Sequence, residues 1–258
     1  MENVLVKKKE GLAYVTLNRP ESLNCFNFDM LMELGELTEK LRHDKETRVV
    51  IFTGAGEKAF SSGADLKERK TLSEEDVRRN VHKIRTVFHE ISKLPQVTIA
   101  AVNGYAFGGG FELMLACDFR LAADHARMGL TETSWAIIPG AGGTQRLPRL
   151  IGEAKAKELI LTARKLDAAS AFNFGILTGI TSSDRLMQEC EDLAREILSN
   201  GPVAVEQAKY AISCGMETDL ATGLEIEAKA YELTIPTYDR REALNAFSEK
   251  RPPQFTGK

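Results

Sequence analysis

Two glutamates combine a reactive side chain with an unusual setting. Glu112 follows Gly108-Gly109-Gly110, and its neighbours in an expected helix are apolar on every face: Phe111, Leu113, Met114, Leu115, Ala116 and Cys117. A carboxylate buried there costs several kcal/mol unless it is paired, protonated or used in chemistry. Unpaired burial also raises its pKa toward the range of acid–base catalysis. The alternative is a glutamate that is ion-paired within the core.

Glu132 is the second carboxylate of interest. It lies between Thr131 and Thr133, shortly before the glycine-rich segment 139–143. A loop glutamate of this kind is most often a solvated surface residue. Two carboxylates form a catalytic pair only where the fold brings them together, and the spacing of these two along the chain leaves that open.

Two turns could supply backbone N–H groups to a reacting oxygen. Gly108-Gly109-Gly110 connects an expected buried strand to an expected helix. The first amides of such a helix are unpaired and carry the positive end of the helix dipole. In the segment 60–67, a Gly-Ala-Asp turn can leave the N–H of Ala64 free. The alternatives are a tightly packed strand-to-helix turn and a plain loop.

Motifs for other chemistries are incomplete. His89-Glu90 opens an H-E-x-x-H zinc motif, but Lys93 stands where the second histidine is needed. The segment 54–58 lacks the spacing of a P-loop, and Ser61-Ser62-Gly63 lacks the first glycine of a nucleophile elbow. We therefore expect no metal site, no NTPase and no serine hydrolase.

The composition is ordinary for a soluble globular protein, with 43% hydrophobic and 28% charged residues. A net charge of −3 argues against a generally basic nucleic-acid or membrane-surface binder. No apolar run approaches the ~18 residues of a membrane span, and the N-terminus lacks the apolar region of a secretory signal. The four cysteines are Cys25, Cys117, Cys190 and Cys214, and they show no C-x-x-C spacing. This pattern indicates reduced thiols, so we expect a cytoplasmic protein.

The elements that must position these residues follow from hydrophobic periodicity. Helical spacing of apolar residues predicts amphipathic helices over about 28–43 and 74–94. Short apolar or alternating runs predict strands at 3–9, 12–18, 49–53 and 97–102, with weaker candidates at 118–124 and 176–181. From residue 184 onward the pattern is helical, over about 184–199, 203–214, 217–234 and 239–249. The periodicity therefore predicts an α/β region followed by helices.

Together these segments resemble the enoyl-CoA hydratase/isomerase (crotonase) family, and the likeness spans nearly the whole chain in the right order. The matching strings are Leu17-Asn18-Arg19-Pro20 with Leu23-Asn24 and Asn27, then 59–66, 106–113, 138–147 and 246–253. Within the family, the segments 129–133 and 66–69 look most like the methylglutaconyl-CoA hydratases, which act in leucine breakdown. The resemblance implies a hydratase of short or branched 2-enoyl-CoA thioesters in leucine or fatty-acid metabolism. An enoyl-CoA isomerase, another CoA-thioester enzyme of this fold and a non-catalytic binding protein are the alternatives.

The resemblance also implies a fold. Family members wind repeated ββα units into a spiral, and a C-terminal helical region then packs trimers, which usually pair into hexamers. We therefore expect a spiral core over residues 1–195 and a C-terminal helical region over 196–258, in a homotrimer or a dimer of trimers.

Site roles follow from the same resemblance. The N–H groups of Ala64 and Gly109 correspond to an oxyanion hole for the thioester carbonyl, where addition of water creates enolate charge. Glu132 would protonate the α-carbon, and Glu112 would hold and activate the attacking water. The expected substrate-binding residues also include Asp65, Leu66, Lys67, Gly108, Trp135, Phe247 and Lys250. Coenzyme A is part of the substrate, so no separate cofactor is expected.

Two finer expectations concern substrate and partners. Trp135 would shorten the acyl pocket and favour short or branched acyl groups, unless it only packs under its loop. Phe247 and Lys250 would reach the CoA of a neighbouring subunit. Some members near this branch bind AU-rich RNA through a lysine-studded helix. Here the corresponding helix, about 28–43, is acidic, so we expect no nucleic-acid partner, and no membrane partner either.

Overall fold

The computed structural model describes residues 2–258 and is built around a six-stranded sheet, in the order β1-β2-β3-β5-β7-β10. The strands are β1 (Val4–Lys9), β2 (Leu12–Leu17), β3 (Val49–Gly54), β5 (Val97–Val102), β7 (Phe119–Ala123) and β10 (Gly179–Thr181). β1 and β2 form an antiparallel hairpin, whereas every later pair in this sheet is parallel. The sheet therefore aligns the carboxyl ends of β3, β5 and β7, from which the loops to the site depart.

Both faces of this sheet are covered, which explains why its central strands are apolar throughout. Val50 and Phe52 of β3 join the larger core, beneath α1 (Phe28–Arg42) and α3 (Glu74–Ser92). Val49 and Ile51 point to the opposite face and pack in a second core with α8 (Leu186–Leu198). Because successive side chains of a strand point to opposite faces, one strand contributes alternate residues to each of the two cores.

A second, smaller sheet carries the site. Its order is β4-β6-β8-β9, with β4 (Ala59–Ser61), β6 (Tyr105–Phe107), β8 (Arg127–Gly129) and β9 (Leu166–Asp167). β4, β6 and β8 are parallel, and β9 pairs antiparallel to β8. Each parallel strand is followed directly by a segment with a candidate catalytic group, so this sheet brings residues 64, 109 and 132 into one region.

Shorter helices connect and cover these strands. They are α2 (Leu66–Arg69), α4 (Gly109–Ala116), α5 (Gly143–Ile151), α6 (Glu153–Leu161) and α7 (Ala168–Asn173), with 3₁₀ turns η1 (Pro20–Ser22) and η2 (Glu132–Trp135). All eight residues of α4 are buried, as its apolar sequence predicts. This mixture of parallel sheets and helices confirms the predicted fold class.

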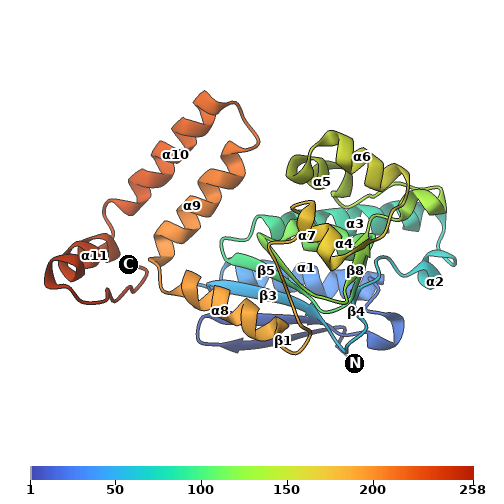
Figure 1. The fold of residues 1–258 in the computed structure, drawn as a ribbon, viewed down its shortest axis with the longest axis horizontal. Helices are drawn as coiled ribbons and strands as arrows, with labels where there is room; N and C mark the ends of the chain where they lie inside the picture. Colours follow the sequence, from blue (N-terminus) through green and yellow to red (C-terminus); the bar gives the residue numbers. More distant parts are fainter. Residues whose placement is uncertain (1) are drawn as a thin grey trace.

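Three C-terminal helices lie to one side of the sheets, as Figure 1 shows in orange and red: α9 (Pro202–Gly215), α10 (Leu220–Thr234) and α11 (Tyr238–Glu249). Lys209 of α9 is tied to the sheet region by an ion pair to Asp118 at 2.6 Å. The predicted division between residues 195 and 196 falls inside α8 and stays a prediction. Within residues 2–258, no helix combines the length and the apolar character that crossing a membrane requires.

Candidate active site

A cavity of about 770 Å³ lies where α2, α3, α4 and η2 meet. Its wall includes both candidate carboxylates, Glu112 and Glu132, and both candidate donors, Ala64 and Gly109. Residues 112 and 132 belong to different strand-to-helix connections, and the second sheet brings those connections side by side. Their convergence, which sequence spacing left open, is thus present in the structure.

Glu112 is held by the start of another helix. Its side chain is only 3% exposed, and its Oε1 accepts hydrogen bonds from the N–H groups of Ala141 at 2.7 Å and Gly143 at 2.8 Å. Gly143 is the first residue of α5, so the carboxylate supplies the N-terminal cap that Gly142 has no side chain to provide. The positive end of the α5 dipole therefore faces this carboxylate.

Opposing influences act on the proton affinity of Glu112. Burial raises its pKa above the ordinary value, whereas the amides of Gly143 and Ala141 and the charges of Arg146 and Arg69 act in the opposite direction. The two amide donors therefore fix the orientation of this buried carboxylate and stabilise its ionised form.

Glu132 has a different environment. It is partly buried in η2, and its Oε2 is enclosed without any hydrogen-bond partner among residues 2–258. Burial, followed by the nearby charge of Glu112, raises the pKa of Glu132 to about 7. Gly108 has a positive φ of 50°, and a Cβ there would lie 3.3 Å from Glu132 Oε1, so this glycine leaves room for the carboxylate.

Two backbone amides face the same cavity. Phe26 donates its N–H to the carbonyl of Gly63 at 2.8 Å and accepts from the N–H of Asp65 at 3.0 Å, which fixes the backbone on both sides of Ala64. The Ala64 N–H and the Gly109 N–H, the first of α4, donate to no acceptor within residues 2–258. Gly63 adopts φ +98°, and a Cβ there would lie 3.1 Å from Gly109 N, so the two donor segments pack closely. This arrangement can stabilise negative charge on one oxygen.

The family model described as Enoyl-CoA hydratase/isomerase matches residues 7–258. The chain belongs to the enoyl-CoA hydratase/isomerase family. It is 53% identical over 250 residues to YngF of Bacillus subtilis (strain 168), a protein named for the same family, covering 97% of this chain and 96% of that one.

Two further relatives extend the comparison. Human mitochondrial methylglutaconyl-CoA hydratase is 47% identical over 257 residues, covering 98% of this chain and 76% of that protein. The crystal structure of an enoyl-CoA hydratase from Bacillus anthracis covers 100% of both chains at 50% identity, with a TM-score of 0.98. The family resemblance expected from the sequence motifs is confirmed.

Of the other expected substrate-binding residues, some line the cavity and others do not. Gly108, Leu66 and Trp135 line the cavity, and Trp135 remains 64% exposed at its mouth. Asp65 and Lys67 do not line it. The Asp65 carboxylate instead caps α2, where it accepts from the N–H groups of Lys67 and Glu68.

Phe247 and Lys250 lie at the end of α11, outside the cavity of this single chain. Phe247 is 85% exposed. A role of these two residues at a neighbouring subunit's CoA stays a prediction.

Several lining residues were not expected from the sequence. Val77, Val81 and Ile84 belong to the apolar stripe of α3, which periodicity alone attributes to the core. Arg69 and Arg85 also line the cavity, and neither forms an ion pair among residues 2–258. Arg69 stands one turn after the cap Asp65, and this spacing is the only sequence signal that could have indicated its position.

Residues 2–258 contain no group of three or more His, Cys, Asp or Glu side chains that could hold a metal ion. The polar groups on the cavity wall include the carboxylates of Glu112 and Glu132, the backbone amides of Ala64 and Gly109, and the guanidinium groups of Arg69 and Arg85. The expectation that the reaction needs no separate cofactor stays a prediction.

Proposed function

We propose that this protein is an enoyl-CoA hydratase that adds water across the 2,3 double bond of a short or branched 2-enoyl-CoA. The observation that carries the proposal is the presence of both carboxylates, Glu112 and Glu132, in one cavity with the unpaired amides of Ala64 and Gly109. Hydration needs a base for water, an acid for the α-carbon and donors for the enolate oxygen. This cavity offers each of them.

In the proposed reaction, the thioester oxygen accepts hydrogen bonds from the N–H groups of Ala64 and Gly109. The oxygen of a water held by Glu112 bonds to the β-carbon while Glu112 takes a proton from that water. The double-bond electrons move toward the thioester, and its oxygen carries the enolate charge. Glu132 then gives its proton to the α-carbon, and the two carboxylates return to their starting state through solvent.

The proton distribution of the pair supports these roles. Two carboxylates in one cavity disfavour double ionisation, so the pair tends to keep one proton near neutral pH. The amides of Ala141 and Gly143 favour the charged form of Glu112, whereas Glu132 Oε2 receives no hydrogen bond from residues 2–258. We therefore place the charge on Glu112 and the proton on Glu132.

We further propose that the preferred substrate is 3-methylglutaconyl-CoA or a similar branched enoyl-CoA with a distal carboxylate. Arg69 and Arg85 support this substrate class because they add positive charge to the cavity wall and form no ion pair within residues 2–258. The similarity to human methylglutaconyl-CoA hydratase points in the same direction and links the protein to leucine breakdown, with fatty-acid metabolism as the wider alternative. Trp135, at the cavity mouth, would disfavour long acyl chains.

A substrate panel tests this proposal. We expect kcat/KM to be highest for 3-methylglutaconyl-CoA, lower for crotonyl-CoA and lowest for a C10 enoyl-CoA. The loss of enoyl-thioester absorbance measures each rate. Arg85→Met should reduce kcat/KM for the carboxylate substrate about tenfold or more and leave crotonyl-CoA within about threefold, because only the former has a charge to lose. Faster turnover of the C10 substrate than of crotonyl-CoA would contradict the proposed pocket size.

An enoyl-CoA isomerase is the second candidate. A pKa of about 7 suits Glu132 for moving a proton between two carbons, which is all that isomerisation requires. Glu112→Gln separates the two activities. It should abolish hydration, whereas an isomerase that uses only Glu132 would keep its activity. A protein that reacts with neither enoyl substrate class would be a binding protein.

We propose a homotrimer, or a dimer of trimers, as the assembly. The support is a set of exposed large apolar side chains on α9, α10 and α11, more than a monomer is expected to leave in water: Tyr210, Ile212, Met216, Leu220, Leu224, Tyr231, Leu233, Tyr238, Leu244 and Phe247. Sedimentation equilibrium should give about three or six times the chain mass of 28.5 kDa. A monomer at micromolar concentration would contradict this assembly.

We propose a cytoplasmic location, supported by four cysteines that are all free in the structure. No nucleic-acid or membrane partner is proposed. The support is the acidic surface of α1, where Asp29, Glu33, Glu36 and Glu39 outnumber Lys40 and Arg42. Tight, salt-sensitive binding of an AU-rich oligonucleotide at moderate salt would overturn this view.

A further inference from the structure

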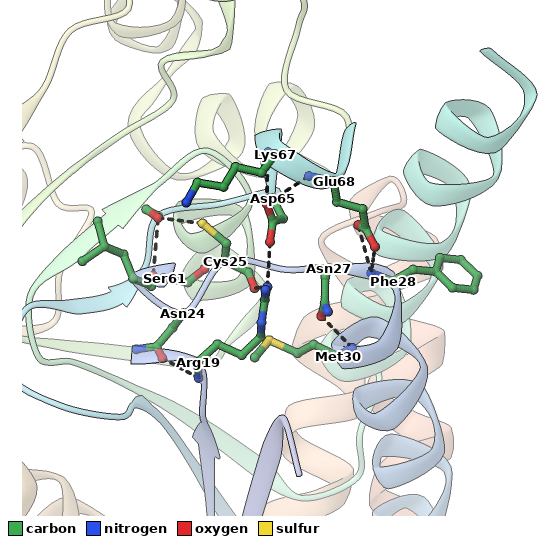
Figure 2. A network of polar contacts seen from close by, with 12 residues as sticks. Arg19, Asn24, Cys25, Asn27, Phe28, Met30, Ser61, Asp65, Lys67 and Glu68 are labelled. Atoms are coloured by element: carbon green, nitrogen blue, oxygen red, sulfur yellow. Dashed lines mark hydrogen bonds and ion pairs between the residues drawn. The ribbon is translucent and has the colours of Figure 1, made fainter. Parts of the chain in front are cut away.

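The segment before α1 and the start of α2 are joined by a buried ion pair behind the Ala64 donor. Figure 2 shows Arg19 reaching across to Asp65, and the Arg19 Nη1 atom lies 2.9 Å from Asp65 Oδ2. The Arg19 and Asp65 side chains are 17% and 11% exposed. Such a pair is screened far less than a surface ion pair, and removal of one partner leaves a poorly solvated charge.

The Asp65 carboxylate makes contacts on both sides. Its Oδ1 accepts from the N–H groups of Lys67 at 3.1 Å and Glu68 at 3.2 Å, so it caps α2, while its Oδ2 faces Arg19. Burial alone would raise the pKa of Asp65, but the Glu68 amide and Arg19 lower it below the ordinary value. Asp65 therefore stays ionised at neutral pH and can keep both contacts.

Arg19 is itself fixed by its surroundings. Its Nη1 donates to the carbonyl of Cys25 at 2.8 Å, and its backbone N–H donates to Asn24 Oδ1 at 2.9 Å. Asn24 is fully buried, and its Nδ2 donates to the carbonyls of Ala55 and Ala59. The guanidinium group is thus held at the Cys25 carbonyl, and the Arg19 backbone is anchored through Asn24 to the segment that leads into β4.

The ion pair fixes the residue that follows Ala64, and neither of its side chains lines the cavity. Ala64 is the residue between Gly63 and Asp65, whose backbone groups both bond to Phe26. Arg19 and Asp65 are absent from the cavity wall, whereas Ala64 forms part of it. A rotation of the Ala64–Asp65 backbone would turn the Ala64 N–H away from the thioester oxygen, and the Arg19–Asp65 pair opposes that rotation from behind.

We propose that Arg19 and Asp65 are positioning residues, which hold the Ala64 N–H in the direction of the enolate oxygen. This inference rests on the proposed thioester chemistry of the cavity. It gives Asp65 a role in orientation rather than in direct substrate contact. Because donors at an oxyanion hole act on charge that develops in the transition state, loss of the pair affects kcat more than KM.

The first test is kinetic. Arg19→Gln and Asp65→Asn should each lower kcat for hydration about tenfold or more, with KM within about threefold, because a small misplacement of a catalytic donor is costly. The double variant should be no slower than the slower single variant, since both changes remove one interaction. Arg19→Lys, which keeps the charge, should recover part of kcat.

The matched control is Arg42→Gln. Arg42 also joins two segments through an ion pair, to Glu90, and through bonds to the carbonyls of Glu90 and Lys93, but away from Ala64. This variant should lose thermal stability and keep kcat. If Arg42→Gln lost as much kcat as Arg19→Gln, the effect would be general destabilisation and the positioning role would fall.

A spectroscopic test separates this inference from the proposed function. Acetoacetyl-CoA bound in an oxyanion hole gains enolate character, which absorbs in the near ultraviolet. Wild-type protein and Arg42→Gln should show this band, and Arg19→Gln should show less of it at saturation. If wild-type protein formed the enolate but hydrated no substrate, the hydratase proposal would fail while the positioning role stood. An undiminished band and unchanged kcat in Arg19→Gln would overturn the positioning role alone, and absence of the band in wild-type protein would overturn both.

Discussion

Glu112 and Glu132 face one cavity, but different parts of the chain hold them in different ways. Glu112 is enclosed in α4 and receives two amide N–H groups from the start of α5. Glu132 lies in the 3₁₀ turn η2, where one carboxylate oxygen is buried and no group in the described part of the chain donates to it. The comparison shows that the two identical side chains have different surroundings: two amide donors favour the charged form of Glu112, whereas burial, followed by the charge of Glu112, raises the pKa of Glu132 to about 7.

The largest expected effect comes from removing either carboxylate. Glu112→Gln and Glu132→Gln should each lower kcat for hydration about 10³-fold, the usual scale of acid–base groups. The two variants should differ in α-proton exchange, measured by NMR of a saturated acyl-CoA in deuterated water. Glu132→Gln should lose this exchange, whereas Glu112→Gln should keep it within about tenfold. Equal loss in both variants would contradict the division of roles.

A smaller effect should follow from Arg146, which supports the loop that holds Glu112. Its Nη1 donates to the carbonyl of Ala141 at 3.0 Å, and its charge lowers the pKa of Glu112. Arg146→Gln should lower kcat about tenfold, because the Ala141 amide is then less well placed. Since Glu112 must be ionised to accept a proton from water, a higher pKa moves the acidic limb of the pH–rate profile to higher pH.

The control for this prediction is Arg149→Gln on the same helix. Arg149 is exposed and bonds only to Gln145, one turn earlier. It should leave both kcat and the acidic limb unchanged, and Arg146→Lys should restore part of the limb. An unmoved limb in Arg146→Gln would mean that Arg146 does not act through Glu112.

The smallest effect concerns stability. Since the folded-state pKa of Glu132 is about 7, against 4.5 ordinarily, the folded protein binds this proton more tightly than the unfolded chain does. The free energy of unfolding therefore falls as pH rises from about 4.5 to 7 and stays low above that range. At pH 8, Glu132→Gln should be more stable than wild type by about 1–2 kcal/mol, after allowance for partial exposure.

Urea unfolding at two pH values checks this prediction. The gain of Glu132→Gln should vanish near pH 4, where the wild-type side chain is already neutral. Glu112→Gln should gain less at pH 8, because its two amide donors already stabilise the charge. A larger gain in Glu112→Gln would reverse the comparison between the two carboxylates.

Much of the fold could be predicted from the sequence, because its long elements have clear periodicity. The strand expected at 97–102 is β5, and the helices expected near 28–43 and 74–94 are α1 and α3. The second sheet could not be found in this way, since its strands have two or three residues and show no alternation. The expectation of repeated ββα units came from the family resemblance rather than from a local pattern.

The four residues that the sequence indicated as catalytic line one cavity, but their surroundings were not predicted. An isolated glutamate in an apolar helix and glycines at a strand end indicated Glu112 and Gly109. The two amides that hold Glu112 come from 29 and 31 residues further along the chain, and no local pattern reports such a contact. Arg69 was hidden for a similar reason, because a charged side chain on a short helix is ordinarily exposed.

The most direct test of the central claim is a titration of Glu132 itself. Carbon-13 NMR of protein labelled at glutamate carboxyl carbons, assigned by loss of one signal in Glu132→Gln, gives its pKa in the free protein. We expect one glutamate signal to titrate near pH 7 and to be the signal that is lost in Glu132→Gln. If every glutamate signal titrated below about pH 5, as exposed glutamates do, Glu132 would not carry a proton at neutral pH, and the division of roles between the two carboxylates would be wrong.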